Sequence, residues 1–281
     1  MTLSDARSLL FVPADRPERH AKALASGADW VIIDLEDAVG PDGKAAARDL
    51  LQTSVAALPA ASRGRLLVRI NGEGTSWLDG DLVLAGRLAA LGLGALMVPK
   101  AEGLPLLQKV TAAVPGLPLV VQIESGAGLD ALDLIARGPG VARLCLGHLD
   151  LQNDLGIRCG PDESEIAPAR WDIVRASRRA GLPPPIDSVT TDVRDTDAID
   201  RDAARALRQG FGGKLCIHPA QVGRVNAAYT PDTAQRDWAR RVLDAVAASG
   251  GAACTLDGRM VDLPVISAAK RLLARAAMAP A

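Results

Sequence analysis

Eight short apolar runs occur between residues 8 and 218, and each is followed by a segment that has helical spacing or is rich in alanine. The runs are apolar at successive positions rather than alternate ones, which is typical of strands covered on both faces, as in parallel sheets. Eight strand–helix units in a row favour an α/β fold whose sheet closes into a (β/α)8 TIM barrel. The predicted strands are SLLFV (8–12), WVIID (30–34), LLVRI (66–70), ALMVP (95–99), LVVQI (119–123), RLCLG (143–147), PPID (184–187) and KLCIH (214–218).

The chain has 281 residues, whereas such a barrel takes about 250, so one barrel leaves room for an appendage. We assign residues 1–229 to the barrel domain and residues 230–281 to a short C-terminal helical extension. In this extension TPDTAQRDWARRVLDAVAASGG (230–251) is expected to form a helix that begins near its aspartate and stops at Gly-Gly. DGRMVD (257–262) is expected to be a hairpin-like or turn segment that serves as a lid, and Pro264 allows a final helix to begin. Barrel helices are expected over residues 17–26, 43–57, 77–91, 103–113, 127–137, 167–180, 196–209 and 219–228.

The composition argues against two classes of partner. Lys and Arg number 32 against 33 Asp and Glu, so a formal net charge of −1 gives no positive field to hold a nucleic acid. No apolar run approaches the roughly 18 residues of a membrane-spanning helix, and the first residues do not resemble an export signal. We therefore expect a cytoplasmic protein with no nucleic-acid partner and no membrane partner. The four cysteines lack CxxC spacing, which argues against a zinc site or a disulfide framework.

Charged and amide side chains stand at the carboxyl ends of the predicted strands, where a barrel has its functional mouth. Several are carboxylates, and carboxylates that converge on one cavity need a cation to neutralise them. Oxygen ligands without a His or Cys cluster favour Mg²⁺, which keeps several waters and often uses only one or two protein carboxylates. The residues concerned are Asp34, Glu36, Asp37, Arg69, Asn71, Lys100, Gln122, Glu124, Ser125, Asp150, Asp187 and His218.

Glu124 and Asp150, from neighbouring strand ends, are the pair that we assign to Mg²⁺. Arg69 would bind a substrate carboxylate with its planar guanidinium while the metal polarises a neighbouring carbonyl, an arrangement that stabilises an enolate. The alternative for the two acids is a structural ion pair, because buried charges are normally paired. His218 is interpreted as a hydrogen-bonded packing residue rather than a base, since no nucleophile neighbours it in sequence.

Glu36, Asp37 and Lys100 allow more than one interpretation. Either acid could cap the following helix, pair with Arg16 or Lys44, or hold metal-bound water. Lys100 follows a proline and is either an ordinary ion-pair partner or a substrate contact. We expect Arg16, Glu36, Asp37 and Lys100 to belong with Arg69 to the substrate-binding site.

The chain resembles the citrate lyase β-subunit-like (CitE-like) family, which includes malyl-CoA and citramalyl-CoA lyases and belongs with the HpcH/HpaI aldolases. The shared motifs occur in the family's order and span almost the whole chain, which is more specific than any single motif. They are RSLLFVPADRPERHAKALASGADWVIIDLEDAV, VRIN, VPKAE, QIESGAG, GHLDLQNDLG, PPIDSV, GFGGKLCIHPAQV and DGRMVDLP.

The resemblance implies that Mg²⁺ is held by Glu124 and Asp150 and that Arg69 binds substrate. It places Glu36 and Asp37 near the water shell of the metal. In long family members a C-terminal segment covers a neighbouring subunit's active site and supplies an aspartate, which corresponds here to Asp262. The resemblance thus implies a homo-oligomer, commonly a trimer or hexamer, in which Asp262 is a catalytic acid or base.

The activity implied is reversible cleavage of a carboxylated 3-hydroxyacyl-CoA, such as malyl-CoA or citramalyl-CoA, into an acyl-CoA and a 2-oxoacid. The alternatives are a CoA-independent 2-oxoacid aldolase, a malyl-CoA thioesterase, a citrate lyase β subunit acting on citryl-carrier protein, and a non-catalytic binding subunit. His148 stands just before Asp150, where a smaller residue is expected, so the pocket and its substrate are left open. The chain is also among the family's shorter members, which makes the reach of the Asp262 segment a separate question.

Overall fold

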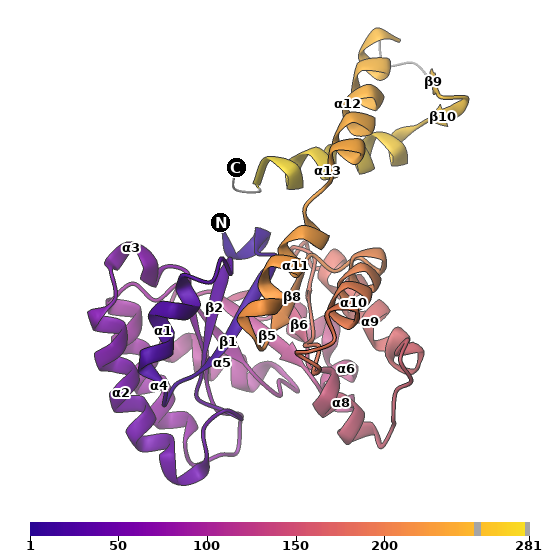
Figure 1. The fold of residues 1–281 in the computed structure, drawn as a ribbon. Helices are drawn as coiled ribbons and strands as arrows, with labels where there is room; N and C mark the ends of the chain where they lie inside the picture. Colours follow the sequence, from indigo (N-terminus) through magenta and orange to yellow (C-terminus); the bar gives the residue numbers. More distant parts are fainter. Residues whose placement is uncertain (250–253, 279–281) are drawn as a thin grey trace. The chain divides into compact units, whose positions relative to one another are not determined.

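Eight parallel strands close into a barrel in chain order in the computed structural model, which describes residues 1–249 and 254–278 (Figure 1). Each strand pairs with the next, and β8 closes the barrel by pairing with β1, with Ser8 opposite Lys214. The predicted TIM barrel is therefore confirmed. The strands are β1 (Ser8–Pro13), β2 (Trp30–Asp34), β3 (Leu66–Arg69), β4 (Ala95–Val98), β5 (Leu119–Ile123), β6 (Val141–Leu146), β7 (Ile186–Asp187) and β8 (Gly213–Cys216).

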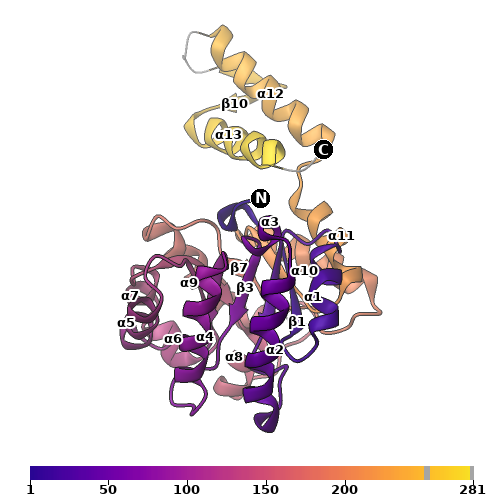
Figure 2. The ribbon, with the colours of Figure 1, turned by 90° about the vertical axis from the view of Figure 1, so that its left-hand side faces the viewer.

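Helices follow the strands and surround the barrel (Figures 1 and 2). Most of them lie within a few residues of the predicted ranges. They are α1 (Pro17–Leu24), α2 (Lys44–Ala57), α3 (Ala60–Arg63), α4 (Leu78–Ala90), α5 (Leu104–Ala113), α6 (Gly126–Asp130), α7 (Leu132–Ala136), α8 (His148–Leu155), α9 (Ala167–Arg179), α10 (Thr196–Gln209) and α11 (Pro219–Tyr229), with 3-10 turns at Leu3–Asp5, Pro41–Gly43 and Ser164–Ile166.

Two helical regions differ from the prediction. The helix expected over residues 127–137 is two short helices, α6 and α7, separated at Ala131. Helix α8 was not predicted, and it ends at Gly156, which adopts the left-handed conformation (φ 65°) common at helix C-termini. As a result Asp150 lies in the first turn of a helix rather than at the end of strand β6.

The barrel interior is filled by apolar side chains, so the barrel is a packed core and not a channel. These side chains come from successive strands and touch one another along the barrel axis. A solid interior leaves the strand ends and the segments that follow them as the place for a site. The cluster includes Leu9, Ile32, Leu67, Met97, Val120, Cys145, Ile186 and Leu215.

The chain divides into two compact units, Thr2–Asn226 and a second that begins at Ala227 and also includes Met1. The second unit contains α12 (Thr233–Ala248), an antiparallel hairpin of β9 (Cys254–Leu256) and β10 (Arg259–Val261), and α13 (Leu263–Met278). Its small core includes Ala239, Val242, Val261 and Ala269. Residues 250–253 and 279–281 of the predicted extension lie outside the described residues. Within the described part of the chain, no helix is long and apolar enough to span a membrane.

Candidate active site

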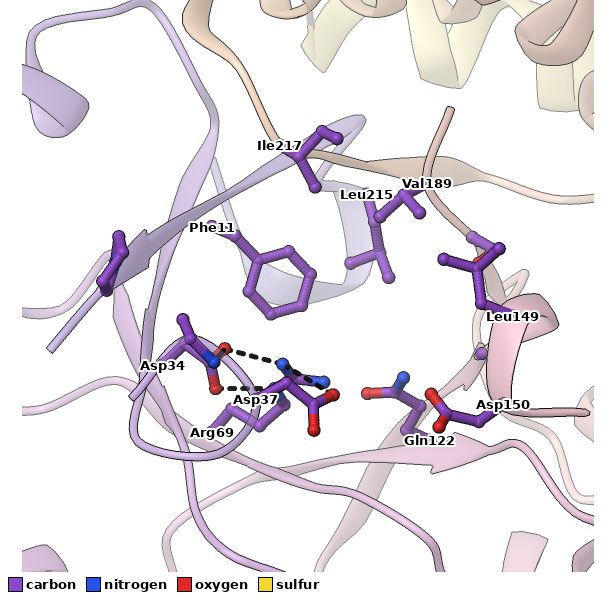
Figure 3. Close-up of a pocket in the computed structure, with 14 residues that line it drawn as sticks. Phe11, Asp34, Asp37, Arg69, Gln122, Leu149, Asp150, Val189, Leu215 and Ile217 are labelled. Carbon is purple, nitrogen blue, oxygen red and sulfur yellow. Dashed lines mark hydrogen bonds and ion pairs between the residues drawn. The ribbon is translucent and has the colours of Figure 1, made fainter. Parts of the chain in front are cut away.

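A pocket of about 370 Å³ lies at the carboxyl ends of the barrel strands (Figure 3). Arg69 ends β3, Asp34 ends β2, and Asp150 lies on α8, so the pocket wall is built from distant parts of the chain. This is the face on which barrel enzymes carry their active sites. The lining residues are Phe11, Pro13, Asp34, Asp37, Ala38, Arg69, Gln122, Gly147, Leu149, Asp150, Ser188, Val189, Leu215 and Ile217.

Arg69 is buried and makes a two-point contact with Asp34. Its Nε and Nη2 atoms donate to the two carboxylate oxygens of Asp34 at 2.7 and 2.6 Å. Its Nη1 atom lies 2.9 Å from Glu36 Oε2, and Nη2 lies 3.4 Å from Asp37 Oδ2. The Phe11 ring covers the guanidinium at 4.8 Å. Burial lowers the pKa of Arg69, but the hydrogen bonds and charges of these acids outweigh it and raise the pKa, so the guanidinium is a permanent cation.

Glu36 connects Arg69 to Lys100. Lys100 Nζ donates to Glu36 Oε1 at 2.7 Å and lies 3.9 Å from Asp37. Burial raises the pKa of Glu36, and the neighbouring Arg69 and Lys100 charges oppose that rise. Within the part of the chain that the structure describes, Lys44 has no ion pair with a side-chain carboxylate. Its ammonium donates to the backbone oxygens of Leu35 and Glu36 and to Asn71 Oδ1.

Glu124 is buried and receives two short hydrogen bonds. The backbone N–H of Lys100 donates to its Oε1 atom at 2.7 Å, and Gln122 Nε2 donates to its Oε2 atom at 2.6 Å. Lys100 holds a left-handed backbone conformation (φ 49°), which is uncommon for a residue with a side chain and is typical of constrained functional sites. A Cβ atom at Gly147 would lie 2.3 Å from Glu124 Oε2, so only glycine leaves room for this carboxylate.

Burial, reinforced by the charges of Glu36 and Asp150, raises the pKa of Glu124 to about 8. Ionisation of Glu124 beside Glu36 and Asp150 is therefore unfavourable, and a bound cation would favour the ionised form. Glu124 and Asp150, with water and ligand oxygens, fit a divalent ion that prefers oxygen donors. The Oε1 atom of Gln122 is also buried and has no hydrogen-bond partner among the described residues. Residues 1–249 and 254–278 contain no group of three His, Cys, Asp or Glu side chains arranged to hold a metal by themselves.

His148 is buried beside Asp150 and bonds to the end of β7. Its Nδ1 atom lies 2.5 Å from Ser188 Oγ, and its backbone N–H donates to the same oxygen at 3.1 Å. Burial lowers the pKa of His148, which favours the neutral ring. The larger residue at this position therefore fastens the start of α8 to the neighbouring strand and does not point to metal coordination.

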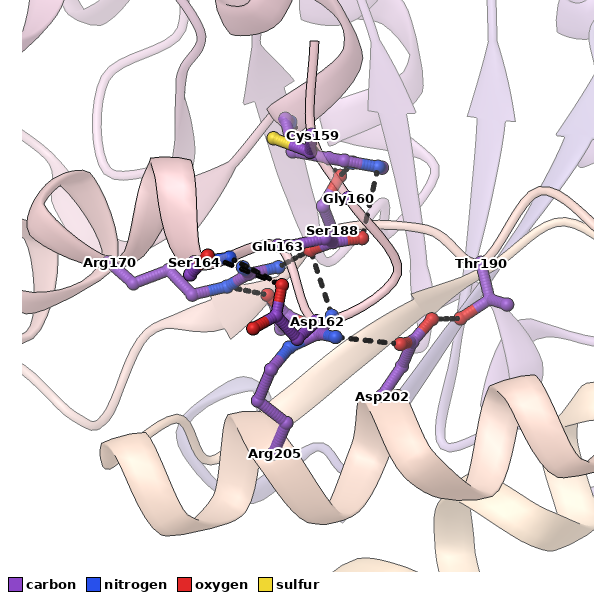
Figure 4. A network of polar contacts seen from close by, with 12 residues as sticks. Cys159, Gly160, Asp162, Glu163, Ser164, Arg170, Ser188, Thr190, Asp202 and Arg205 are labelled. Carbon is purple, nitrogen blue, oxygen red and sulfur yellow. Dashed lines mark hydrogen bonds and ion pairs between the residues drawn. The ribbon is translucent and has the colours of Figure 1, made fainter.

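A second polar network braces the loop after α8 (Figure 4). The Glu163 carboxylate pairs with Arg170 on α9 and with Arg205 on α10, at 2.8 Å for the latter. Arg205 also pairs with Asp202, which accepts a hydrogen bond of 2.6 Å from Thr190. His148 Nε2 lies 3.8 Å from Glu163, so the network reaches the helix that carries Asp150.

The structure brings Glu36, Asp37, Arg69 and Lys100 together by ion pairs, and it places Glu124 within their electrostatic reach. Arg16 stands after β1, but its side chain is exposed and pairs with Asp15 at 3.9 Å, so it joins neither the pocket lining nor this cluster. Among the described residues, Glu36 and Asp37 pair with Arg69 and Lys100 and not with Arg16.

Asp262 is exposed in the second unit and accepts a hydrogen bond of 3.2 Å from the Val265 amide. It therefore caps the first turn of α13. His218 accepts a hydrogen bond of 3.2 Å from the Ala220 amide, as the hydrogen-bonded interpretation expected, but its side chain is exposed, so the packing role is wrong.

Three pocket residues carry roles that the sequence analysis did not assign. Asp34 fixes Arg69, Gln122 fixes Glu124, and Phe11 covers the guanidinium. Asp34 and Arg69 both stood among the predicted strand-end residues, and the structure places them opposite each other across β2 and β3. Gln122 precedes Glu124 by two residues, and side chains two apart along an extended chain point to the same face, so the two were within reach of each other.

Comparison with known proteins gives an independent line of support. The model of the HpcH/HpaI aldolase/citrate lyase family matches residues 7–219. A citrate lyase subunit beta-like protein of Deinococcus radiodurans is 36% identical over 96% of this chain and 97% of its own length. A (3S)-malyl-CoA thioesterase of Cereibacter sphaeroides is 33% identical over 96% of this chain and 94% of its own.

Among solved structures, the protein CitE of Mycobacterium tuberculosis in complex with magnesium, acetoacetate and coenzyme A matches with a TM-score of 0.83. It is 35% identical to this chain, and the match covers 98% of this chain and 100% of that one. The family model covers all eight strands, and the relatives match over nearly the full length. The chain therefore belongs to the HpcH/HpaI aldolase/citrate lyase family of carbon–carbon lyases.

Proposed function

We propose that this enzyme is a Mg²⁺-dependent lyase that splits a carboxylated 3-hydroxyacyl-CoA, such as malyl-CoA or citramalyl-CoA, into an acyl-CoA and a 2-oxoacid. The observation that carries the proposal is the buried Glu124 carboxylate, whose pKa is raised to about 8 by burial and by the charges of Glu36 and of Asp150, which lines the pocket. Such a concentration of acids is costly unless a cation is bound there. The magnesium of the CitE complex, which also contains acetoacetate and coenzyme A, supports the same assignment.

Glu124 and Asp150 would hold the ion, and Mg²⁺ when bound would act as a Lewis acid on oxygen atoms of the oxoacid portion. Asp34 occupies the Nε–Nη2 edge of Arg69, so the substrate carboxylate would meet the Nη1–Nη2 edge, where Glu36 faces Nη1 at 2.9 Å. Asp37 is half exposed and 3.4 Å from Nη2, so it is the acid that a substrate carboxylate would displace. Lys100, already bound to Glu36, would add positive charge on the same side.

Cleavage requires the substrate hydroxyl to lose its proton while the electrons of the carbon–carbon bond pass to the thioester as an enolate. The enolate carbon then takes up a proton, so the reaction consumes no net proton. We assign this protonation, and removal of the same proton during condensation, to Asp262. The exposed position of Asp262 in the second unit is consistent with a residue that serves a neighbouring copy in a homo-oligomer, and we propose a trimer or hexamer.

A malyl-CoA thioesterase is the second candidate, because relatives with that name match 96% of this chain. The same binding site would serve, with water attacking the thioester carbonyl. The two activities differ in their products: a lyase releases a 2-oxoacid and leaves the thioester intact, whereas a thioesterase releases free CoA.

The test is to incubate the enzyme with malyl-CoA and with citramalyl-CoA and to follow 2-oxoacid and free CoA separately, with Mg²⁺ or with a chelator. We expect 2-oxoacid release that stops when the metal is removed. Release of CoA alone would assign the thioesterase instead. The absence of both products would direct the search to CoA-independent aldol substrates.

A further inference from the structure

The pocket at the carboxyl ends of the barrel strands, which we call the mouth pocket, has two chemically different sides (Figure 3). One side carries the charged and amide groups Asp34, Asp37, Arg69, Gln122 and Asp150, and the other is formed by five apolar side chains. We call the second side the apolar wall, and it consists of Phe11, Leu149, Val189, Leu215 and Ile217.

The apolar wall has a buried inner part and an exposed rim. Leu215 is 1% exposed and belongs to the barrel core, against which Phe11 and Val189 pack. Leu149 and Ile217 are 48% and 40% exposed and form the rim. The inner part of the wall is thus fixed by core packing, while the rim can be changed without opening the core.

The position of Phe11 relates the wall to the group that would bind the substrate carboxylate. Its ring lies 4.8 Å from the Arg69 guanidinium, so the apolar side begins directly beside the arginine. Among the residues that line the pocket, Arg69 is the one cationic side chain, and it already faces Asp34, Glu36 and Asp37. A second carboxylate on the substrate would lie against apolar groups without a cation of its own, which is unfavourable.

We infer that the oxoacid portion of the substrate bears a small uncharged alkyl group, methyl or ethyl, which the apolar wall receives in preference to a hydrogen atom or a second carboxylate. The inference rests on the proposed function and narrows it to pyruvate-type products. A hydrogen in place of the alkyl group leaves part of the wall in contact with water, and a carboxylate loses its hydration there. Discrimination of one alkyl carbon in an apolar pocket is about 10-fold or more.

Binding can be measured without turnover. Isothermal titration calorimetry of the Mg²⁺-loaded protein would compare pyruvate and 2-oxobutyrate with glyoxylate and oxaloacetate. We expect each alkyl oxoacid to bind about 10-fold more tightly than glyoxylate and than oxaloacetate. Equal affinities for all four acids, or tighter binding of oxaloacetate, would overturn the inference.

Ile217→Arg places a cation on the rim of the wall, where the side chain is 40% exposed and a longer one can be accommodated. This variant should shift the ratio of oxaloacetate to pyruvate affinity toward oxaloacetate by about 10-fold. The matched control is Val83→Arg on α4, a change of the same kind at a side chain that is 58% exposed and absent from the pocket. The control should leave the ratio unchanged, and an unchanged ratio in Ile217→Arg would contradict the role of the wall.

The apolar wall could instead receive the acyl part of the thioester. Condensation of pyruvate with acetyl-CoA and with propionyl-CoA tests this, because Ile217→Arg should then alter the choice of acyl-CoA and not the choice of oxoacid. That pattern would overturn the inference. If the protein binds alkyl oxoacids selectively but shows no Mg²⁺-dependent cleavage, the proposed lyase function is wrong, whereas the inferred selectivity of the apolar wall is supported.

Discussion

Asp34 and Arg69 are opposite each other across β2 and β3, and their side chains are joined by two hydrogen bonds of 2.7 and 2.6 Å. Asp34 also accepts hydrogen bonds from the backbone N–H groups of Glu36 and Ala38. One carboxylate therefore holds both the arginine and the turn that carries Glu36 and Asp37. The pair fixes which edge of the guanidinium faces the pocket.

Asp34→Asn should weaken oxoacid binding because it releases the Nε–Nη2 edge of Arg69, and it should cost about 3–5 kcal/mol of unfolding free energy, as expected when a buried ion pair is broken. The matched control is Asp29→Asn at the opposite end of β2, where Asp29 pairs with Arg7 at 2.9 Å. Denaturant unfolding and calorimetry would compare them. Asp29→Asn should lose stability without losing oxoacid affinity, and a parallel loss of affinity would refute a specific role for Asp34.

Arg69→Lys should lose most of the activity, because an ammonium group cannot replace the planar fork that holds Asp34 while presenting a second edge to substrate. Circular dichroism would check that the barrel is retained, and steady-state assays would measure the rate. A rate equal to that of the unchanged enzyme would remove Arg69 from the substrate site.

Mg²⁺ affinity should fall sharply in Glu124→Gln and in Asp150→Asn, by more than the roughly 10–100-fold cost of losing an outer-shell partner. Asp154→Asn is the control for Asp150, since it lies on the same helix and its carboxylate accepts a bond from the Gly126 amide. Calorimetric titration with Mg²⁺ would separate the three variants. Unaltered affinity in Glu124→Gln or Asp150→Asn would exclude that residue as a ligand.

Asp262→Asn separates catalysis from helix capping, because asparagine caps a helix as well as aspartate but cannot transfer a proton in the same way. We expect a loss of about 10²–10⁴ in rate with unchanged thermal stability. Asp232→Asn is the control, as Asp232 caps α12 in the same unit through the Gln235 amide. Full activity in Asp262→Asn would reduce Asp262 to a helix cap.

Lys214→Met should destabilise the barrel by about 3–5 kcal/mol, because Asp187 is fully buried between Lys214 (2.9 Å) and Arg170 (3.2 Å). Burial raises the pKa of Asp187, but these two cations outweigh it and lower the pKa below its ordinary value of 3.8. Its contribution to stability is therefore fully present above pH 3.8 and is lost as the pH falls through the lowered pKa. Between pH 6 and pH 2 the free energy of unfolding should fall less in Lys214→Met than in the unchanged protein. An identical dependence on pH in the two proteins would contradict the pairing of Lys214 with Asp187.

The barrel was predictable from sequence because each strand is a continuous apolar run, so its eight repeats are visible without tertiary information. The strand ends also predicted which charged residues meet, including Arg69 with Glu36 and Lys100. Helix α8 was missed because HLDLQNDL has weak helical amphipathicity and begins directly after Gly147. The spacing of the residues did not reveal which partner each acid would have. Asp34 faces Arg69 because the two are opposite each other in the strand register, whereas Glu124 is oriented by the Lys100 amide and Gln122.

We expect the carboxylates of Glu124 and Asp150 to make carbon–carbon cleavage dependent on magnesium. The most direct measurement is pyruvate release from citramalyl-CoA, recorded against Mg²⁺ concentration for the unchanged enzyme and for Glu124→Gln. We expect pyruvate release that rises with Mg²⁺ concentration, stops when a chelator is added and is absent in Glu124→Gln at every Mg²⁺ concentration. Release that persists in chelator, or equal release by Glu124→Gln, would contradict it.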